Sequence, residues 1–167
     1  AWVFLFVPYQ KNTILNFLDL LRDIRGSGYN AYQSIIAIGN GGAAGTGVGY
    51  GTQSELKYLP EYKTDFVFAA FAEEWGFVGA FTLIILFVSI LVYFIYLAYV
   101  AKSNFETLFT YGVVFWLLTH ATINIGMNLG VLPVTGLPLP YMSYGGSHLL
   151  LETVAAAMVM GMARTRK

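Results

Sequence analysis

Residues 77–101 read FVGAFTLIILFVSILVYFIYLAYVA, a run of 25 residues without Asp, Glu, Lys or Arg. At a rise of about 1.5 Å per residue, a helix of this length crosses a hydrocarbon core of about 30 Å with some tilt. Glu73 and Glu74 precede the run and Lys102 follows it, so charged residues flank it on both sides. The run therefore predicts a membrane-spanning helix.

The composition of the whole chain indicates the same environment. Of its 167 residues, 57% are hydrophobic and 11% are charged, whereas about 25% of the residues of a soluble domain are charged. The formal net charge of zero offers no general attraction for nucleic acid, so we expect no nucleic-acid partner. Because the sequence has no cysteine, it excludes disulfides, thiolate catalysis and cysteine zinc sites within it. We predict an all-α polytopic membrane protein.

Apolar blocks and loops divide the rest of the chain. The first block lacks a basic flank and a small-residue cleavage site, so we expect the chain to be the C-terminal part of a larger protein. Proline and glycine interrupt a second charge-free stretch and separate it into a helix, a loop and a last helix. The predicted order is the end of a spanning helix (1–9), an outer loop (10–76), a span (77–101), a second span (105–129), an outer Pro/Gly loop (130–146), a third span (147–163) and a basic tail (164–167).

Charges at the ends of the spans predict the orientation. Lys102 and the basic tail lie on the same side because two predicted helices separate them, and the positive-inside rule places that side in the cytoplasm. The long first loop and the Pro/Gly loop then both lie on the outer side. Within the first loop, residues 12–24 have the mixed apolar and charged pattern of an interfacial amphipathic helix.

Asp65 lies in the outer loop, within the segment YLPEYKTDFVF at 58–68. A carboxylate at a membrane edge is a candidate general base for a proton close to lipid. The alternative is structural: Thr64 is the N-cap of a helix, and Asp65 stands in its first turn, where the helix dipole favours an acid. Glu61 either assists Asp65, binds a cation or pairs with Lys63. The residues alone leave these interpretations open.

Three other groups of residues have both a structural and a functional interpretation. The glycine run IGNGGAAGTGVGYGTQS at 38–54 either forms tight turns or contacts a ligand, but it lacks the G-K-[ST] of a P-loop. Glu73 and Glu74 either anchor the chain at the membrane interface or supply a second catalytic carboxylate. His120 and Asn124 either share a buried hydrogen bond or belong to a proton relay. No metal site is predicted, because no second His lies at ligand spacing.

Several segments together resemble a known family. They are GSGYNAYQSIIAIGNGG at 26–42, GTQSELKYLPEYKTDFVFAAFAEEWGFVG at 51–79, INIGM at 123–127 and LPVTGLPLPYMSYGGS at 132–147. In this order they are similar to the SEDS family, most closely to its RodA branch, with FtsW and SpoVE as relatives. The resemblance implies the C-terminal portion of a roughly ten-helix SEDS fold.

The resemblance also implies a function. The SEDS family polymerises glycan strands of peptidoglycan from lipid II, with a class B penicillin-binding protein, at the outer face of the bacterial cytoplasmic membrane. The triplet Thr64-Asp65-Phe66 matches the family's T-D-F motif, whose acid is the proposed catalytic residue, so the implied catalytic residue is Asp65. No cofactor is identified, although a divalent cation or cationic side chains are expected to neutralise the departing pyrophosphate.

The implied function comes with a set of candidate substrate-binding residues. They are Glu61, Thr64, Gly47, Gly49, Gln53, Ser143, Gly145, Gly146 and Ser147. We expect a peptidoglycan glycosyltransferase that serves cell-wall elongation and cell-shape maintenance. Two other functions stay open. One is a flippase or transporter of the lipid-linked precursor, which would use His120 and Asn124, and the other is a non-catalytic scaffold for a penicillin-binding protein.

Overall fold

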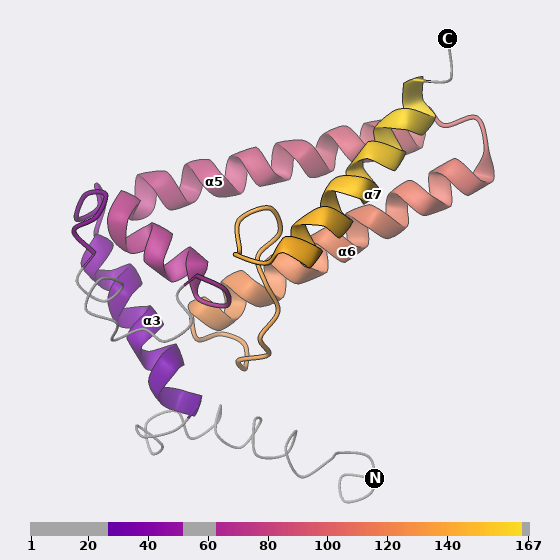
Figure 1. The fold of residues 1–167 in the computed structure, drawn as a ribbon. Helices are drawn as coiled ribbons and strands as arrows, with labels where there is room; N and C mark the ends of the chain where they lie inside the picture. The colour runs from indigo at the N-terminus through magenta and orange to yellow at the C-terminus, as the bar shows by residue number, and fades with distance from the viewer. Residues whose placement is uncertain (1–26, 52–62, 165–167) are drawn as a thin grey trace, which may run out of the picture.

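The computed structural model describes residues 27–51 and 63–164. The described helices are α3 (Ser27–Gly41), α5 (Val67–Tyr99), α6 (Asn104–Asn128) and α7 (Gly146–Arg164) (Figure 1). These residues contain no strand, which confirms the all-α fold class. The predicted helix end at 1–9 and the predicted amphipathic helix at 12–24 lie outside the described residues.

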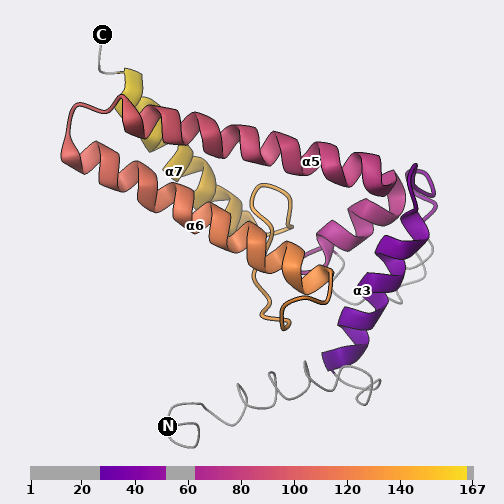
Figure 2. The ribbon, with the colours of Figure 1, turned by 180° about the vertical axis from the view of Figure 1, so that it is seen from behind.

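Three helices, α5, α6 and α7, are long and apolar enough to cross a membrane. Helices α6 and α7 begin and end within one residue of the predicted spans at 105–129 and 147–163. Ser103 is the N-cap of α6, and its hydroxyl accepts a hydrogen bond from the Phe105 amide at 3.3 Å. The connection between α5 and α6 lies at the same end of the bundle as the end of α7 (Figures 1 and 2).

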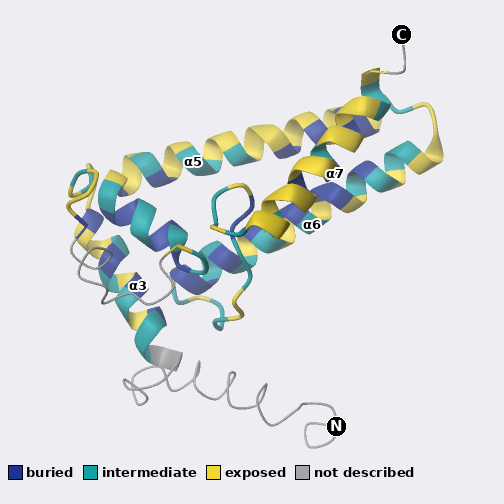
Figure 3. Cartoon of the chain, in the orientation of Figure 1, coloured by how far each residue is buried: buried dark blue, intermediate teal, exposed yellow. Residues whose placement is uncertain are grey.

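The core of the bundle consists of apolar side chains from all three spanning helices. Leu91 and Phe94 of α5, Leu117 of α6 and Val159 of α7 are each at most 5% exposed. The outward faces of the same helices carry exposed Leu, Ile, Val and Phe side chains (Figure 3). Because a large exposed apolar surface is unfavourable in water, these faces indicate contact with lipid or with further protein. The chain is therefore a multi-pass membrane protein.

Helix α5 has a sharp kink at Gly76, where φ is 67° and ψ is −167°. Its first section, residues 67–75, packs against α3, and its second section, residues 77–99, runs beside α6 (Figures 1 and 2). We predicted an outer loop up to residue 76, but the helix already begins at Val67. The charge-free run begins only after the acidic pair Glu73-Glu74. Glutamate is a good helix former, however, so the helix includes this pair and begins further upstream.

The glycine loop, residues 42–51, forms hydrogen bonds with the first section of α5 at the kink. The kink separates the carbonyls of Glu73 and Glu74 from their usual partners, the amides four residues further on. The amides of Thr46 and Gly47 replace those partners, donating to the two carbonyls at 3.0 and 3.1 Å. The Thr46 hydroxyl also donates to the Glu73 carbonyl, at 3.0 Å.

The same loop forms hydrogen bonds with the second section. The amides of Phe77 and Val78 donate to two carbonyls of the loop, at 2.9 and 3.2 Å. Gly45 permits this close approach, because a Cβ at that position would overlap the carbonyl oxygen of Glu74 and its φ is 83°. The glycine loop therefore sets the direction of the first section relative to the second.

Glu73 corrects one of our interpretations. Its side chain is 0% exposed, so it does not anchor the chain at the membrane interface. Glu73 lies in the first section of α5, whose backbone at Ala72 and Glu73 packs closely on Gly41 at the end of α3. Glu74, its neighbour, is partly exposed and lines a cavity.

Candidate functional site

Asp65 lies in a turn, residues 63–66, that immediately precedes α5. Three successive carbonyls of this Asp65 turn accept hydrogen bonds from parts of the chain that are distant in sequence. The Lys63 carbonyl accepts from the Tyr144 amide at 2.8 Å. The Thr64 carbonyl accepts from the Ser143 hydroxyl at 2.7 Å, and the Asp65 carbonyl accepts from side chains of α6. The backbone of the turn is therefore fixed from two directions.

Two fully buried asparagines of α6 hold the Asp65 carbonyl. The Nδ2 groups of Asn124 and Asn128 donate to it at 2.9 and 3.1 Å. Asn124 Nδ2 also donates to the Leu137 carbonyl at 2.8 Å. Asn128 Oδ1 accepts from the Ala69 amide at 3.1 Å, which gives a partner to one of the first amides of α5. The pair thus joins the turn, the helix after it and the following loop.

The Asp65 side chain is half-buried and faces the Pro/Gly loop, which occupies residues 129–145 in the structure. Its Oδ2 lies 3.5 Å from the position that a Cβ would take on Gly136, where φ is 70°. The interpretation of this segment as a helix cap is wrong. The N-cap of α5 is Phe66, whose own side chain forms no capping hydrogen bond, so neither Thr64 nor Asp65 fills that role.

Ser143 links the Pro/Gly loop to the Asp65 turn. Its hydroxyl donates to the Thr64 carbonyl and accepts from the Leu139 amide, the second bond also at 2.7 Å. The Ser143 amide donates to the Leu139 carbonyl at 3.0 Å, which closes a tight turn within the loop. The structure thus gives Ser143 a positioning role, and its contact with substrate stays a prediction.

A cavity of about 740 Å³ opens beside the Asp65 turn. Its walls belong to the first section of α5, the end of the Pro/Gly loop and the start of α7. The lining residues are Lys63, Val67, Ala70, Phe71, Glu74, Tyr141, Met142, Ser143, Tyr144, Gly145, Gly146 and Leu149. Small-molecule sites typically occupy about 300–1,000 Å³, so the cavity has the size of a ligand site. Lys63 and Glu74 give it one cationic and one anionic side chain.

Glu74 connects this cavity to the glycine loop. Its Oε1 accepts from the Gly49 amide at 3.4 Å, and its carbonyl accepts from the Gly47 amide at 3.1 Å. Both predicted glycines therefore contact a residue of the cavity wall, and their contact with substrate stays a prediction. Ser147 follows Gly146 in the first turn of α7, at the edge of the same cavity.

Two predicted site residues cannot be placed. Glu61 and Gln53 lie outside the described residues. Within residues 27–51 and 63–164, no group of three His, Asp, Glu or Cys side chains is arranged to hold a metal ion. Lys63 supplies a cationic group within the Asp65 turn itself.

His120 and Asn124 do not form the pair that their spacing suggested. Asn124 uses its amide group for Asp65 and Leu137, as described above. The His120 ring instead packs against the rings of Trp116 and His148, with centroids 5.5 and 5.3 Å apart. His120 therefore belongs to the contact between α6 and α7.

A buried carboxylate completes the polar groups near the Pro/Gly loop. Glu152 of α7 is 1% exposed, and its Oε2 accepts from the Tyr141 amide at 2.8 Å. Burial raises the pKa of the Tyr141 phenol above its ordinary value, and the Glu152 carboxylate raises it further. The hydroxyl therefore stays protonated and donates to the Glu152 carbonyl at 3.3 Å. Glu152 was not among the residues predicted from the sequence, although an acid inside a predicted span is itself a signal of function.

The sequence of the chain matches a known protein family over its whole length. The profile of the FtsW/RodA/SpoVE family, described as "Cell cycle protein", matches residues 1–167. The chain belongs to this family. The match confirms the resemblance inferred from the T-D-F, INIGM and Pro/Gly-loop motifs.

Curated members of the FtsW/RodA/SpoVE family have similar sequences. The peptidoglycan glycosyltransferase MrdB of Escherichia coli K12 is 42% identical over 166 residues, which cover 99% of this chain and 45% of MrdB. The probable peptidoglycan glycosyltransferase FtsW of Legionella pneumophila is 40% identical over 156 residues, which cover 92% of this chain and 39% of that protein. The chain thus spans less than half the length of these curated relatives.

A solved structure supports the family fold. It is a chain from a study of how polymerization and crosslinking are coordinated by a peptidoglycan synthase complex. The two chains share 33% identity with a TM-score of 0.78, over 99% of this chain and 44% of the other. The helical arrangement described above is therefore that of the corresponding part of this FtsW/RodA/SpoVE-like fold.

Proposed function

We propose that this protein is a peptidoglycan glycosyltransferase that polymerises lipid II into glycan strands during cell-wall elongation, with Asp65 as its catalytic residue. The observation that carries the proposal is the Asp65 turn. It presents a half-buried carboxylate on a backbone fixed through three successive carbonyls. Lys63 of the same turn lines the cavity of ligand size, whereas the Asp65 carboxylate faces Gly136 and is not among the lining residues. The relatives named above, a peptidoglycan glycosyltransferase and a probable peptidoglycan glycosyltransferase, support the reaction class.

The reaction needs a proton acceptor in a fixed position. A sugar hydroxyl attacks the anomeric carbon of a lipid-linked sugar, and a C–O bond forms. The bond from that carbon to the lipid pyrophosphate breaks, and the pyrophosphate leaves with the electron pair. The Asp65 carboxylate accepts the hydroxyl proton. A general base must lie within about 3.2 Å of the proton donor, and a displacement of about 1 Å is costly, so a fixed turn suits this role.

The cavity has both polar and apolar walls, as a lipid-linked sugar phosphate requires. Lys63 supplies positive charge for the pyrophosphate, and the backbone amides of Gly145, Gly146 and Ser147 supply hydrogen-bond donors at the start of α7. The Phe71 side chain contributes apolar surface to the same cavity. A divalent cation would supply the same charge neutralisation, but among residues 27–51 and 63–164 no group of three His, Asp, Glu or Cys side chains is arranged to hold one, so we assign this role to Lys63.

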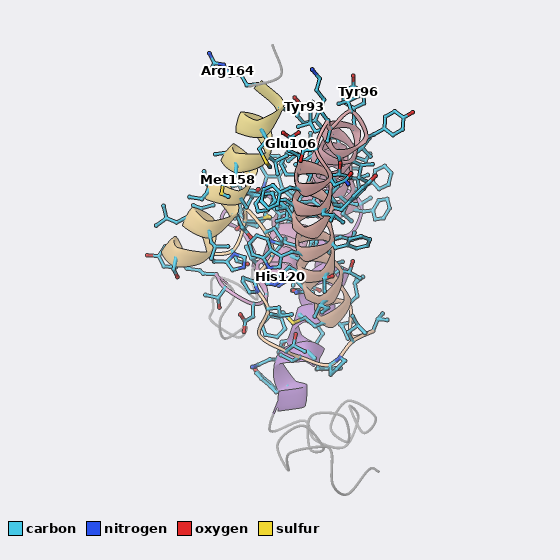
Figure 4. All side chains as sticks on the ribbon, turned by 90° about the vertical axis from the view of Figure 1, so that its right-hand side faces the viewer. Tyr93, Tyr96, Glu106, His120, Met158 and Arg164 are labelled. Atoms are coloured by element: carbon cyan, nitrogen blue, oxygen red, sulfur yellow. The ribbon has the colours of Figure 1, made fainter. Side chains whose placement is uncertain are left out.

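We infer that the site faces outward in the bacterial cytoplasmic membrane. Arg164 and Glu106 lie at the end of the bundle away from the Asp65 turn, and His120 lies further along α6 (Figure 4). Lys102 is in the connection at that same far end, and the positive-inside rule makes this end cytoplasmic. The proposed partner is a class B penicillin-binding protein, which the match to a peptidoglycan synthase complex supports.

A polymerisation assay with the full-length protein, its penicillin-binding partner and purified lipid II tests the proposal. Asp65→Asn keeps the size and polarity of the side chain but removes the proton acceptor. We expect the rate of glycan synthesis to fall by about 10²–10⁴-fold. Glu106→Gln makes the matched acid-to-amide change at the far end of α6 and leaves the rate unchanged.

The alternatives predict different results in the same experiment. Asp65→Asn protein that polymerises lipid II at the wild-type rate would falsify the catalytic role of Asp65. Movement of lipid II across vesicle membranes without polymer would show a flippase. Neither activity, together with retained binding of the penicillin-binding protein, would show a scaffold.

A further inference from the structure

Tyr141 has an unusual backbone conformation within the Pro/Gly loop. Its φ is 60°, and it is the only residue other than glycine with a positive φ among the described residues 27–51 and 63–164. A bulky side chain disfavours this region, so the surrounding structure must hold the residue there. The neighbouring residues Leu139 and Ser143 form the tight turn that ends at the Asp65 turn.

Glu152 of α7 contacts Tyr141 at both ends of the residue. Glu152 Oε2 accepts from the Tyr141 amide at 2.8 Å, and the Glu152 carbonyl accepts from the Tyr141 hydroxyl at 3.3 Å. These two contacts fix the amide and the side chain of the residue whose φ is positive. A left-handed conformation turns the amide toward α7, where a carboxylate is available to accept it.

The carboxylate itself has a partner in the preceding turn of α7. His148 Nδ1 lies 2.8 Å from Glu152 Oε1, an ion-pair distance when the imidazole is protonated. The rings of Trp116 and His120 from α6 lie against the His148 ring, with centroids 6.0 and 5.3 Å away. The group therefore lies between α6 and α7, with the His148 side chain 25% exposed, and is not part of the cavity wall.

An acid at this position is costly unless it has a specific purpose. A spanning helix gains more from an apolar side chain than from a buried carboxylate, and a buried ion pair seldom stabilises more than an apolar replacement. Packing between α6 and α7 alone would therefore favour an apolar residue at 152. What an apolar residue could not supply is an acceptor for the Tyr141 amide.

The residues that follow Tyr141 in the loop form hydrogen bonds with the Asp65 turn. Two residues after Tyr141, the Ser143 hydroxyl donates to the Thr64 carbonyl at 2.7 Å. The next residue, Tyr144, donates its amide to the Lys63 carbonyl at 2.8 Å. Any rotation of the loop at Tyr141 moves both donors away from the turn that carries the carboxylate.

We propose that Glu152, with His148 as its partner, is a positioning residue that holds Tyr141 in its left-handed conformation and thereby fixes the Asp65 turn through Ser143 and Tyr144. This inference rests on the proposed function for its kinetic readout alone. Its structural readout, the protection of the loop amides from exchange, is independent of any activity.

Three variants of the full-length protein separate positioning from general stability. Glu152→Leu removes the acceptor for the Tyr141 amide but fills the space with an apolar side chain. Glu152→Gln keeps an oxygen for that amide and offers an NH₂ donor to His148 Nδ1. Val159→Ala removes core packing from the same helix two turns away, without contact to the loop.

The first measurement is hydrogen exchange of peptides covering residues 139–146. Glu152→Leu should lose protection there at least about tenfold, because the Ser143 and Tyr144 amides become free to open. Glu152→Gln and Val159→Ala should retain protection in this segment. Unchanged protection in Glu152→Leu would overturn the inference, whether or not the protein polymerises lipid II.

The second measurement is the kinetics of lipid II polymerisation. Because a displaced turn impairs chemistry more than binding, Glu152→Leu should lower kcat about 10–100-fold and leave KM within about twofold. Glu152→Gln should stay within about threefold of the wild type. An equal loss of kcat in Val159→Ala, or an unchanged kcat in Glu152→Leu, would overturn the positioning role. A wild-type protein without polymerase activity would reject the proposed function, and the exchange result would then decide the inference.

Discussion

The carbonyl oxygen of Asp65 accepts two side-chain hydrogen bonds, and both donors are asparagines with no exposed surface. Burying an amide side chain is costly unless its groups are paired, so two such residues at one carbonyl indicate that the position of the turn matters. The sequence could single out Asp65 as a candidate because it stands close to a predicted span and matches the T-D-F motif; its catalytic role stays a prediction. Its supports could not be predicted from the sequence, since they lie 59 and 63 residues further along the chain.

The substitution Asn128→Asp tests whether the Asn128 Nδ2 donor holds the Asp65 carbonyl in place. The substitution keeps Oδ1 for the Ala69 amide but replaces the Nδ2 donor with a carboxylate oxygen that faces the Asp65 and Asn124 carbonyls. Leaving buried acceptors without a donor costs about 1–3 kcal/mol, and the polymerisation rate should fall at least about tenfold. Thermal unfolding in detergent and the lipid II assay measure the two effects.

The matched control is Asn104→Asp on the same helix. Asn104 is exposed in the first turn of α6, where the helix dipole favours an acid, so stability and rate should be unchanged or slightly higher. Asn128→Asp protein with wild-type stability and rate would contradict the role of the asparagine pair.

Among the elements, the kinked helix α5 shows most clearly where sequence patterns stop being informative. The charge-free run located the second section of α5, because length and the absence of charge suffice to identify a span. The same criterion put the helix start too late, since it treats any acid as the end of a span. The kink needs Gly76 and the glycine loop together, and no local pattern shows that residues 42–51 replace the hydrogen bonds broken at residues 73–78.

Two glycine substitutions distinguish a structural glycine loop from one that only contacts ligand. At Gly45 a Cβ would overlap the Glu74 carbonyl and φ is 83°, whereas at Gly49 φ is 78° but no atom lies within 4 Å of a Cβ. Gly45→Ala should lower the free energy of unfolding by more than about 3 kcal/mol, and Gly49→Ala by about 1–2 kcal/mol. Thermal or denaturant unfolding of the two purified variants gives the comparison. Equal losses of stability would mean that the loop does not hold the kink.

Considered as a whole molecule, the chain divides into an apolar bundle and a polar end. The bundle end with Lys102 and Arg164 carries basic residues, and the opposite end carries the Asp65 turn, the glycine loop and the Pro/Gly loop (Figure 1). The charge-free runs, divided by the prolines, predicted both the number and the order of the spans among the described residues. Three spans, α5, α6 and α7, separate the glycine loop from the basic tail, so the loop and the tail lie on opposite sides of the membrane. Locating either end therefore tests the orientation of the whole described chain.

Cysteine labelling of the full-length protein, in a background without other cysteines, measures this orientation. Val131, at the start of the Pro/Gly loop, is 66% exposed, and Lys102 is exposed in the connection between α5 and α6. Because basic residues remain in the cytoplasm, a membrane-impermeant maleimide should label Val131→Cys in spheroplasts and label Lys102→Cys only after permeabilisation. Both variants should be labelled equally in detergent, which controls for local accessibility. The reverse pattern in spheroplasts would place Asp65 on the cytoplasmic side, where an enzyme that extends glycan strands outside the cell could not use it.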